Sequence, residues 1–100
     1  MNLISVVSPL TGEKLHDIQA FSADDVAKAF QDARSAQPKW AASAQHRSLV
    51  AKKLAAILAK EQDAMMDQLQ AETGKSRAHA FEEVAGALGA ISYYAKVAPK

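Results

Sequence analysis

The side chains that could act as acids, bases or metal ligands form no recognisable catalytic or metal-binding pattern in this chain of 100 residues. Its three histidines, His16, His46 and His79, show none of the short spacings typical of metal ligands. There is no cysteine, which excludes disulfides, zinc–thiolate sites and a cysteine nucleophile within these residues. We therefore predict ordinary surface or helix-capping positions for the histidines, and no metal site.

The glycines and carboxylates do not form a phosphate-binding or acid–base motif either. Gly74-Lys75-Ser76 matches only the end of a phosphate-binding loop, because Leu69 replaces the upstream glycine and no strand is expected before it. Glu82 and Glu83 are neighbours and would point to different faces of a helix, so they do not make a paired-carboxylate site. No catalytic, cofactor-binding or metal residue is assigned within this sequence.

Composition indicates a mainly helical protein without a nucleic-acid or membrane partner. Twelve basic residues nearly balance eleven acidic ones, for a net charge of +1, whereas nucleic-acid binding typically needs a basic excess. No apolar stretch approaches the ~20 residues of a membrane span. The first residues lack the basic start of a signal peptide, so a cytoplasmic location is expected. Arg47, Lys52 and Lys53 could face an acidic partner, although a solvated helix face is the simpler interpretation.

Two apolar stretches around a turn predict a β-hairpin over residues 1–21. Leu3 to Val7 is rich in β-branched residues, which favour strands. In the turn, Pro9 sets the first corner and Gly12 tolerates positive φ. The return strand would carry Leu15, Ile18 and Phe21. An isolated hairpin is marginally stable in water, so it must pack against another part of the protein.

The first predicted helix begins after Ser22. Ser22 and Asp25 have capping-box spacing, and apolar residues then recur with a helical period at Val26, Ala29, Phe30 and Ala33. Pro38 is expected to end this helix, because it disfavours α geometry at Gln37. Trp40 would then lie in the following connection and anchor it to the core, and ligand stacking is the alternative.

Two long, antiparallel helices are predicted next. Ser43 and Ser76 are good N-caps, and Gly74 supplies the stop between the helices. The short link Gly74-Lys75-Ser76 makes them neighbours. The apolar face of the first is predicted to comprise Val50, Leu54, Ile57, Leu58, Met65 and Leu69. That of the second is predicted to comprise Phe81, Val84, Ala85, Leu88, Ile91 and Ala95, with Tyr93 and Tyr94 as core and rim packing.

Charged residues at this link oppose the dipoles of their own helices. Asp67 and Glu72 close one helix, and Arg77 and His79 open the next. In an antiparallel pair each would lie near an opposite charge, so we expect ion pairs across the link.

The pattern predicts three helices and a hairpin, but no closed core. The last helix is alanine or glycine almost all round from Ala85 to Ala90, and a helix so apolar is usually covered on more than one side. Gly86 and Gly89 each cost up to about 1 kcal/mol relative to alanine, and close approach by another backbone would explain them. We expect other protein to cover this helix, or copies of the chain to self-associate through it.

Four short signatures resemble the aldehyde dehydrogenase family and together cover nearly the whole chain. The turn Ser8-Pro9-Leu10-Thr11-Gly12-Glu13 is similar to the family's Asn-Pro-x-Thr-Gly-Glu, with serine in place of asparagine. The others are Ser22-Ala23-Asp24-Asp25-Val26 with Ala36-Gln37-Pro38-Lys39-Trp40, then Glu72-Thr73-Gly74-Lys75, then Tyr93-Tyr94-Ala95. The stretch from Leu69 to Arg77 and the ending Ala98-Pro99-Lys100 are most similar to succinate-semialdehyde dehydrogenases.

This resemblance implies the amino-terminal segment of an NAD(P)-dependent enzyme that oxidises an aldehyde, such as succinate semialdehyde, to its carboxylic acid. Residues 1–21 would be a hairpin, and residues 22–100 the three-helix part of the cofactor-binding domain of an α/β fold. In the family, the nucleophilic cysteine and the NAD(P) loop lie later in the chain. The segment alone is therefore expected to be inactive, to bind no cofactor and to need the remainder of the dehydrogenase as its partner. A stand-alone helical interaction module is the alternative.

Overall fold

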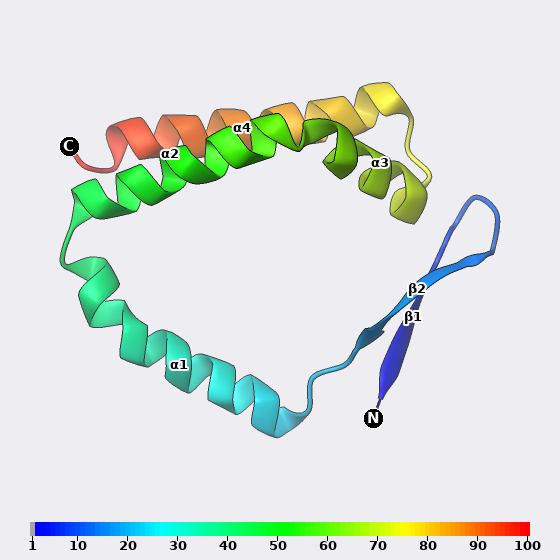
Figure 1. Cartoon of the computed structure of the whole chain (residues 1–100), viewed down its shortest axis with the longest axis horizontal. Coiled ribbons are helices and arrows are strands. Elements are labelled where there is room, and N and C mark those ends of the chain that lie inside the picture. The colour runs from blue at the N-terminus through cyan, green and yellow to red at the C-terminus, as the bar shows by residue number, and fades with distance from the viewer. Residues whose placement is uncertain (1) are drawn as a thin grey trace.

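The computed structural model describes residues 2–100 and shows a β-hairpin followed by four helices within them (Figure 1). Strands β1 (Leu3–Val7) and β2 (Lys14–Gln19) precede α1 (Ala23–Ala41), α2 (Ala44–Lys60), α3 (Gln62–Thr73) and α4 (Arg77–Val97). The mainly α architecture with an amino-terminal hairpin confirms the predicted fold class. The prediction of three helices is wrong by one.

The hairpin is antiparallel and its turn is held by Ser8. Ile4 lies opposite Ile18, with an irregularity in the register between Val6 and Val7. The buried Ser8 hydroxyl accepts hydrogen bonds from the backbone N–H groups of residues 10 and 11, at 3.3 and 3.2 Å. The return strand ends at Gln19. Phe21, which was predicted to belong to that strand, lies beyond it and is exposed.

Helix α1 begins as predicted but does not end at Pro38. Ser22 and Asp25 form a complete capping box. Pro38 lies inside the last turns, and the helix continues to Ala41. Two contacts explain the extension: the N–H of Ala42 donates to the Pro38 carbonyl at 3.2 Å, and the Arg47 guanidinium donates to the carbonyls of Trp40 and Ala41. Trp40 therefore lies in the helix and not in the connection.

The second predicted helix is divided at Glu61 into α2 and α3. The backbone of Glu61 has φ −94° and ψ 13°, outside the helical region. No glycine or proline marks this position, so the apolar pattern continues through the bend. The bend allows Leu58 before it and Met66 after it to pack in the same small core against α4.

The faces that α2, α3 and α4 turn toward one another agree only in part with the predicted ones. The residues of α2 and α3 with reduced exposure recur at helical spacing: Ser48, Ala51, Ala55, Leu58, Gln62, Met66 and Leu69. On α4 they are Ala80, Val84, Leu88, Ile91 and Ala95. Six residues predicted to face the interior are exposed: Val50, Leu54, Ile57, Met65, Phe81 and Ala85. The helices thus pack mainly through small side chains, and much of the larger apolar surface faces outward.

The chain forms a thin, open layer of helices. Its dimensions are 47 × 38 × 16 Å and its radius of gyration is 17.4 Å, against about 13 Å for a compact domain of 100 residues. Figure 1 shows α4 lying along α2 and α3, while α1 and the hairpin extend away from them. Among the described residues, the central core cluster contains Met66, Ala80 and Val84. The predicted lack of a closed core is confirmed.

Helix α4 also lacks the close backbone neighbour expected at its glycines. A Cβ atom built on Gly86 or Gly89 would have no heavy atom within 4 Å, apart from the adjacent residues and the helix's own backbone. Within the described residues, nothing approaches this side of α4. The expectation of a close-packed backbone there is not met by this chain itself.

Candidate functional site

The turn of the hairpin packs against the link between α3 and α4. Gly74 adopts the left-handed conformation with φ 72° and ends α3, as predicted. A Cβ atom on Gly74 would lie 3.6 Å from Pro9 Cγ and 3.7 Å from Leu10 Cβ. Two of the four signature segments, which are far apart in the sequence, therefore meet in space. This contact is the support that the isolated hairpin was expected to need.

Ion pairs lie around the same link between α3 and α4, and they agree only in part with the expectation of ion pairs across it. Arg77 Nη1 lies 2.6 Å from Asp67 Oδ1, and Arg77 Nη2 lies 3.3 Å from Asp63 Oδ1. Glu72 Oε1 is 3.3 Å from Nε2 of His16 in β2, and it does not pair with His79. Lys75 pairs with Glu83. Arg77 thus meets opposite charges across the link, as expected, whereas Glu72 pairs with the hairpin and not across the link.

Replacing Arg77 with glutamate is expected to lower the melting temperature of the chain. The substitution removes two exposed ion pairs, each worth at most about 1 kcal/mol, and it places a third carboxylate beside Asp63 and Asp67. Each kcal/mol lost lowers the melting temperature of a chain this size by about 4–8 °C. Thermal unfolding followed by circular dichroism measures the shift.

The matched control is Lys53→Glu, which makes the same charge change on the exposed surface of α2, away from these pairs. We expect a smaller shift for the control. At about 1 M salt the effect of Arg77→Glu should shrink, because the Debye length falls to about 3 Å. An unchanged or higher melting temperature for Arg77→Glu would contradict this assignment.

The pKa values of two carboxyl groups are lowered by local hydrogen bonds. The backbone N–H of Ser22, followed by its hydroxyl, lowers the pKa of Asp25 within the capping box. The ammonium group of Lys14, followed by the Ser5 hydroxyl, lowers the pKa of Asp17 on the hairpin. Both residues lie on the exposed surface. These shifts therefore reflect local turn and cap structure and do not mark an acid–base centre.

The histidines and aromatic residues do not converge on one site. The ring of His46 packs edge-on against Trp40, with centroids 5.9 Å apart. The backbone N–H of His79 donates to the capping hydroxyl of Ser76. Tyr93 and Tyr94 pack edge-to-face on each other and are both largely exposed, so the prediction of core packing for them is wrong. Among residues 2–100, no three His, Cys, Asp or Glu side chains gather closely enough to hold a metal ion.

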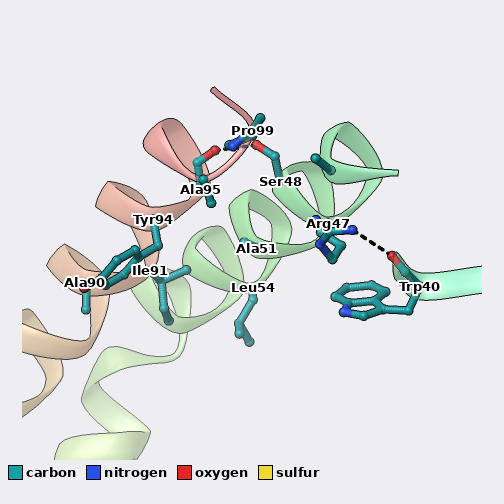
Figure 2. A pocket seen from close by; sticks show the side chains of 12 residues that line it. Trp40, Arg47, Ser48, Ala51, Leu54, Ala90, Ile91, Tyr94, Ala95 and Pro99 are labelled. Atoms are coloured by element: carbon teal, nitrogen blue, oxygen red, sulfur yellow. Dashed lines mark hydrogen bonds between the residues drawn. The ribbon is translucent and has the colours of Figure 1, made fainter. Parts of the chain in front are cut away.

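An apolar groove with a volume of about 410 Å³ runs along α2 and α4. A second, larger hollow of about 760 Å³ lies between the same helices and is lined by Leu49, Lys52 and Ser92 among others. Figure 2 shows the lining of the apolar groove, to which Trp40 of α1, Ala51 and Leu54 of α2, and Ala90, Ile91 and Tyr94 of α4 contribute. At one end, Arg47 Nη1 donates to the Trp40 carbonyl at 3.0 Å. This apolar groove was not predicted from the sequence, because it depends on which faces of α2 and α4 meet.

None of the helices described between residues 2 and 100 has the length and apolar character needed to cross a membrane.

Comparison with known proteins identifies the family. A model of the aldehyde dehydrogenase family matches residues 1–100. A putative succinate-semialdehyde dehydrogenase [NADP(+)] of Mycolicibacterium smegmatis is 41% identical over 91 residues, covering 90% of this chain and 18% of the relative. A putative succinate-semialdehyde dehydrogenase [NADP(+)] 2 of Mycobacterium ulcerans is 39% identical over 88 residues, covering 87% of this chain and 17% of the relative.

A similar protein from Mycobacterium tuberculosis (strain H37Rv), also named putative succinate-semialdehyde dehydrogenase [NADP(+)] 2, is 38% identical over 88 residues, 87% of this chain and 17% of that relative. The chain thus spans less than a fifth of the length of these relatives. The predicted resemblance is confirmed over the whole sequence, and the chain belongs to the aldehyde dehydrogenase family.

Proposed function

We propose that this chain forms the amino-terminal part of an NADP- or NAD-dependent dehydrogenase that oxidises succinate semialdehyde to succinate. The observation that carries the proposal is the family match over residues 1–100. The substrate and the preference for NADP are supported by the names of the relatives at about 40% identity. In such an enzyme, residues 22–100 would supply helices of the cofactor-binding domain, and the rest of the dehydrogenase would cover their exposed apolar faces.

The described residues do not themselves fit a nicotinamide dinucleotide. Such a site needs a glycine-rich loop whose backbone N–H groups meet the pyrophosphate at a helix N-terminus. A serine hydroxyl closes the N-terminus of each of α1, α2 and α4 by accepting a hydrogen bond from a backbone N–H of the first turn. The serines are Ser22, Ser43 and Ser76, respectively. The groove is mostly apolar, and its Arg47 is bonded to backbone carbonyls. We therefore assign no step of hydride transfer to these residues, and we propose that the chain alone is inactive.

A chimeric enzyme tests the proposed function. In the Mycolicibacterium smegmatis relative, the 91 residues that align with this chain would be replaced by the corresponding residues of this sequence. We expect the chimera to reduce NADP when supplied with succinate semialdehyde. The reason is that the contact between the hairpin turn and Gly74, and the core of Met66, Ala80 and Val84, would form in the chimera as in the unmodified relative. Absorbance of the reduced nicotinamide measures turnover. The purified 100-residue chain, assayed alone, should give no signal above the background.

Two controls make the result decisive. A chimera carrying Met66→Asp should lose activity, because a carboxylate would enter the small core against Ala80 and Val84. A chimera carrying Met65→Asp should keep it, since Met65 is exposed in this chain. A soluble, folded chimera without succinate-semialdehyde activity would contradict the proposal, and so would turnover by the 100-residue chain alone.

The apolar groove supports a second candidate function, that of a helical interaction module. The groove exposes large apolar side chains, as protein-binding surfaces often do. An inactive chimera, together with a specific and saturable partner unrelated to dehydrogenases, would favour this second function over the first.

A further inference from the structure

The helix pair formed by α2 and α4 has a hollow on each side, and both hollows contain apolar side chains. The apolar groove is lined by Leu54 and Ile91 among others. The second hollow is lined by Leu49, but also by Lys52 and Lys96. Apolar area alone therefore does not determine which side another layer of protein would cover.

The charged groups of the two hollows differ in their bonding. Arg47 is the charged residue of the apolar groove within the described chain, and its guanidinium already donates to the carbonyls of Trp40 and Ala41, at 3.0 and 2.9 Å. In the second hollow, neither Lys52 nor Lys96 forms an ion pair with any carboxylate of residues 2–100. An ammonium group that leaves water without a partner loses a large hydration free energy. Covering the second hollow would carry that cost twice, whereas covering the apolar groove would leave no charge unpaired.

The other polar side chains of the apolar groove are equally compatible with a covering layer. The buried Ser48 hydroxyl donates to the Ala95 carbonyl at 2.6 Å, so it needs no water. Trp40 and Tyr94 each combine a large apolar ring with one polar group, and both residue types are enriched at protein interfaces. The groove therefore fits an uncharged, apolar surface.

The size of the relatives indicates which protein supplies that surface. The 91 aligned residues make up 18% of the Mycolicibacterium smegmatis relative, so more than four fifths of that protein lies outside the aligned part. A surface within the same chain is present at a high effective concentration. It therefore competes well for the groove against a second copy or an unrelated protein.

We propose that the rest of the dehydrogenase chain covers the apolar groove with an uncharged, apolar surface, while the second hollow, with Lys52 and Lys96, stays in water. This inference rests on the proposed function, because it requires the longer chain, but it does not depend on which aldehyde is oxidised. In this orientation Leu54 is buried against the added protein, and Leu49 of the same helix stays exposed.

Two leucines of α2 allow a matched test in the chimera described above. Leu54 lines the apolar groove and Leu49 lines the second hollow, and their exposed fractions in this chain are similar, at 52% and 56%. Each leucine is replaced by cysteine in a separate chimera. The rate of maleimide labelling is then measured under native conditions and in urea. Mass spectrometry of the labelled peptide separates the new thiol from any cysteine of the relative.

We expect the two positions to differ only in the folded chimera. The native labelling rate of Leu54→Cys should fall about tenfold or more below its rate in urea, because a thiol must be exposed to react. The rate of Leu49→Cys should fall by less than about threefold. If Leu54→Cys prevents folding while Leu49→Cys does not, the proposal is also supported, since a half-exposed leucine matters that much only when it is covered.

Lys52 gives a second readout that needs no substitution. Its ammonium group should be acetylated in the folded chimera at a rate within about threefold of the rate in urea, because the second hollow stays in water. Strong protection of Lys52 would overturn the proposal.

The labelling results can contradict this proposal independently of the proposed function. Equal labelling of Leu49→Cys and Leu54→Cys in a folded, active chimera would overturn the assignment of the groove and leave the dehydrogenase activity standing. Protection of both positions would also overturn it, because both sides would then be covered. A folded chimera that is inactive on succinate semialdehyde, but protects only Leu54→Cys, would remove the proposed substrate and support this inference.

Discussion

Met66→Ala is expected to lower the free energy of unfolding by about 2–5 kcal/mol, the range found for truncating a buried methionine to alanine. Met66 is 6% exposed and lies in a core cluster with Ala80 and Val84. Its thioether side chain joins α3 to α4, and the short side chains of Ala80 and Val84 cannot extend to fill the space it leaves. Because the whole core is small, this change removes a large share of the packing that holds α3 in place. Urea unfolding at a fixed protein concentration, followed by circular dichroism, measures the loss.

The adjacent methionine provides the control. Met65 is 44% exposed, so Met65→Ala should change the free energy of unfolding by about 0.5 kcal/mol or less. The two variants have the same composition and differ only in which side of α3 loses a side chain. Equal effects at the two positions would show that the cluster of Met66, Ala80 and Val84 is not the core.

Ser48→Ala is expected to destabilise the chain by about 1–3 kcal/mol, the cost of leaving a buried polar group without a partner. Ser48 is 9% exposed, and its Oγ donates to the Ala95 carbonyl at 2.6 Å. In a continuing helix the N–H of residue 99 would bond to that carbonyl, but residue 99 is proline and has no N–H. The Ser48 hydroxyl therefore satisfies the end of α4 from the neighbouring helix, and alanine cannot.

Ser92→Ala is the matched change on α4. Ser92 is exposed to solvent, so we expect its substitution to change stability by about 0.5 kcal/mol or less. Comparison of the two urea midpoints isolates the hydrogen bond between α2 and α4. If Ser48→Ala and Ser92→Ala gave the same midpoint, the bond would contribute nothing measurable to stability.

Local features of this chain are predictable because each rests on a few adjacent residues. The capping box of Ser22 and Asp25, the caps at Ser43 and Ser76, and the left-handed stop at Gly74 form as the sequence indicates. Each of these places a donor next to an acceptor within a few positions. The family signatures are equally local, and they identified the aldehyde dehydrogenase family before any helix was placed in space.

Features that local rules predicted wrongly depend on contacts with distant residues. Pro38 does not end α1, because Arg47 supplies hydrogen bonds to the carbonyls of the last turn. No glycine or proline lies at the bend at Glu61, so the sequence does not predict it. The bend keeps both α2 and α3 in contact with α4. Glu72 pairs with His16, because the hairpin lies against the link between α3 and α4.

The sequence by itself determined where the helices begin, which family the chain belongs to, and that its core would be open. Only the tertiary structure decided which apolar face of each helix is turned inward. Periodicity shows that α2 and α4 are apolar, but both helices have apolar residues on more than one side. The hydrophobic effect is non-directional, so it does not determine which of these sides faces inward. The choice is made by the close fit of small side chains such as Ala80 and Ala95 between helices. That fit leaves Val50, Leu54 and Ile57 outside, where another layer of protein can cover them.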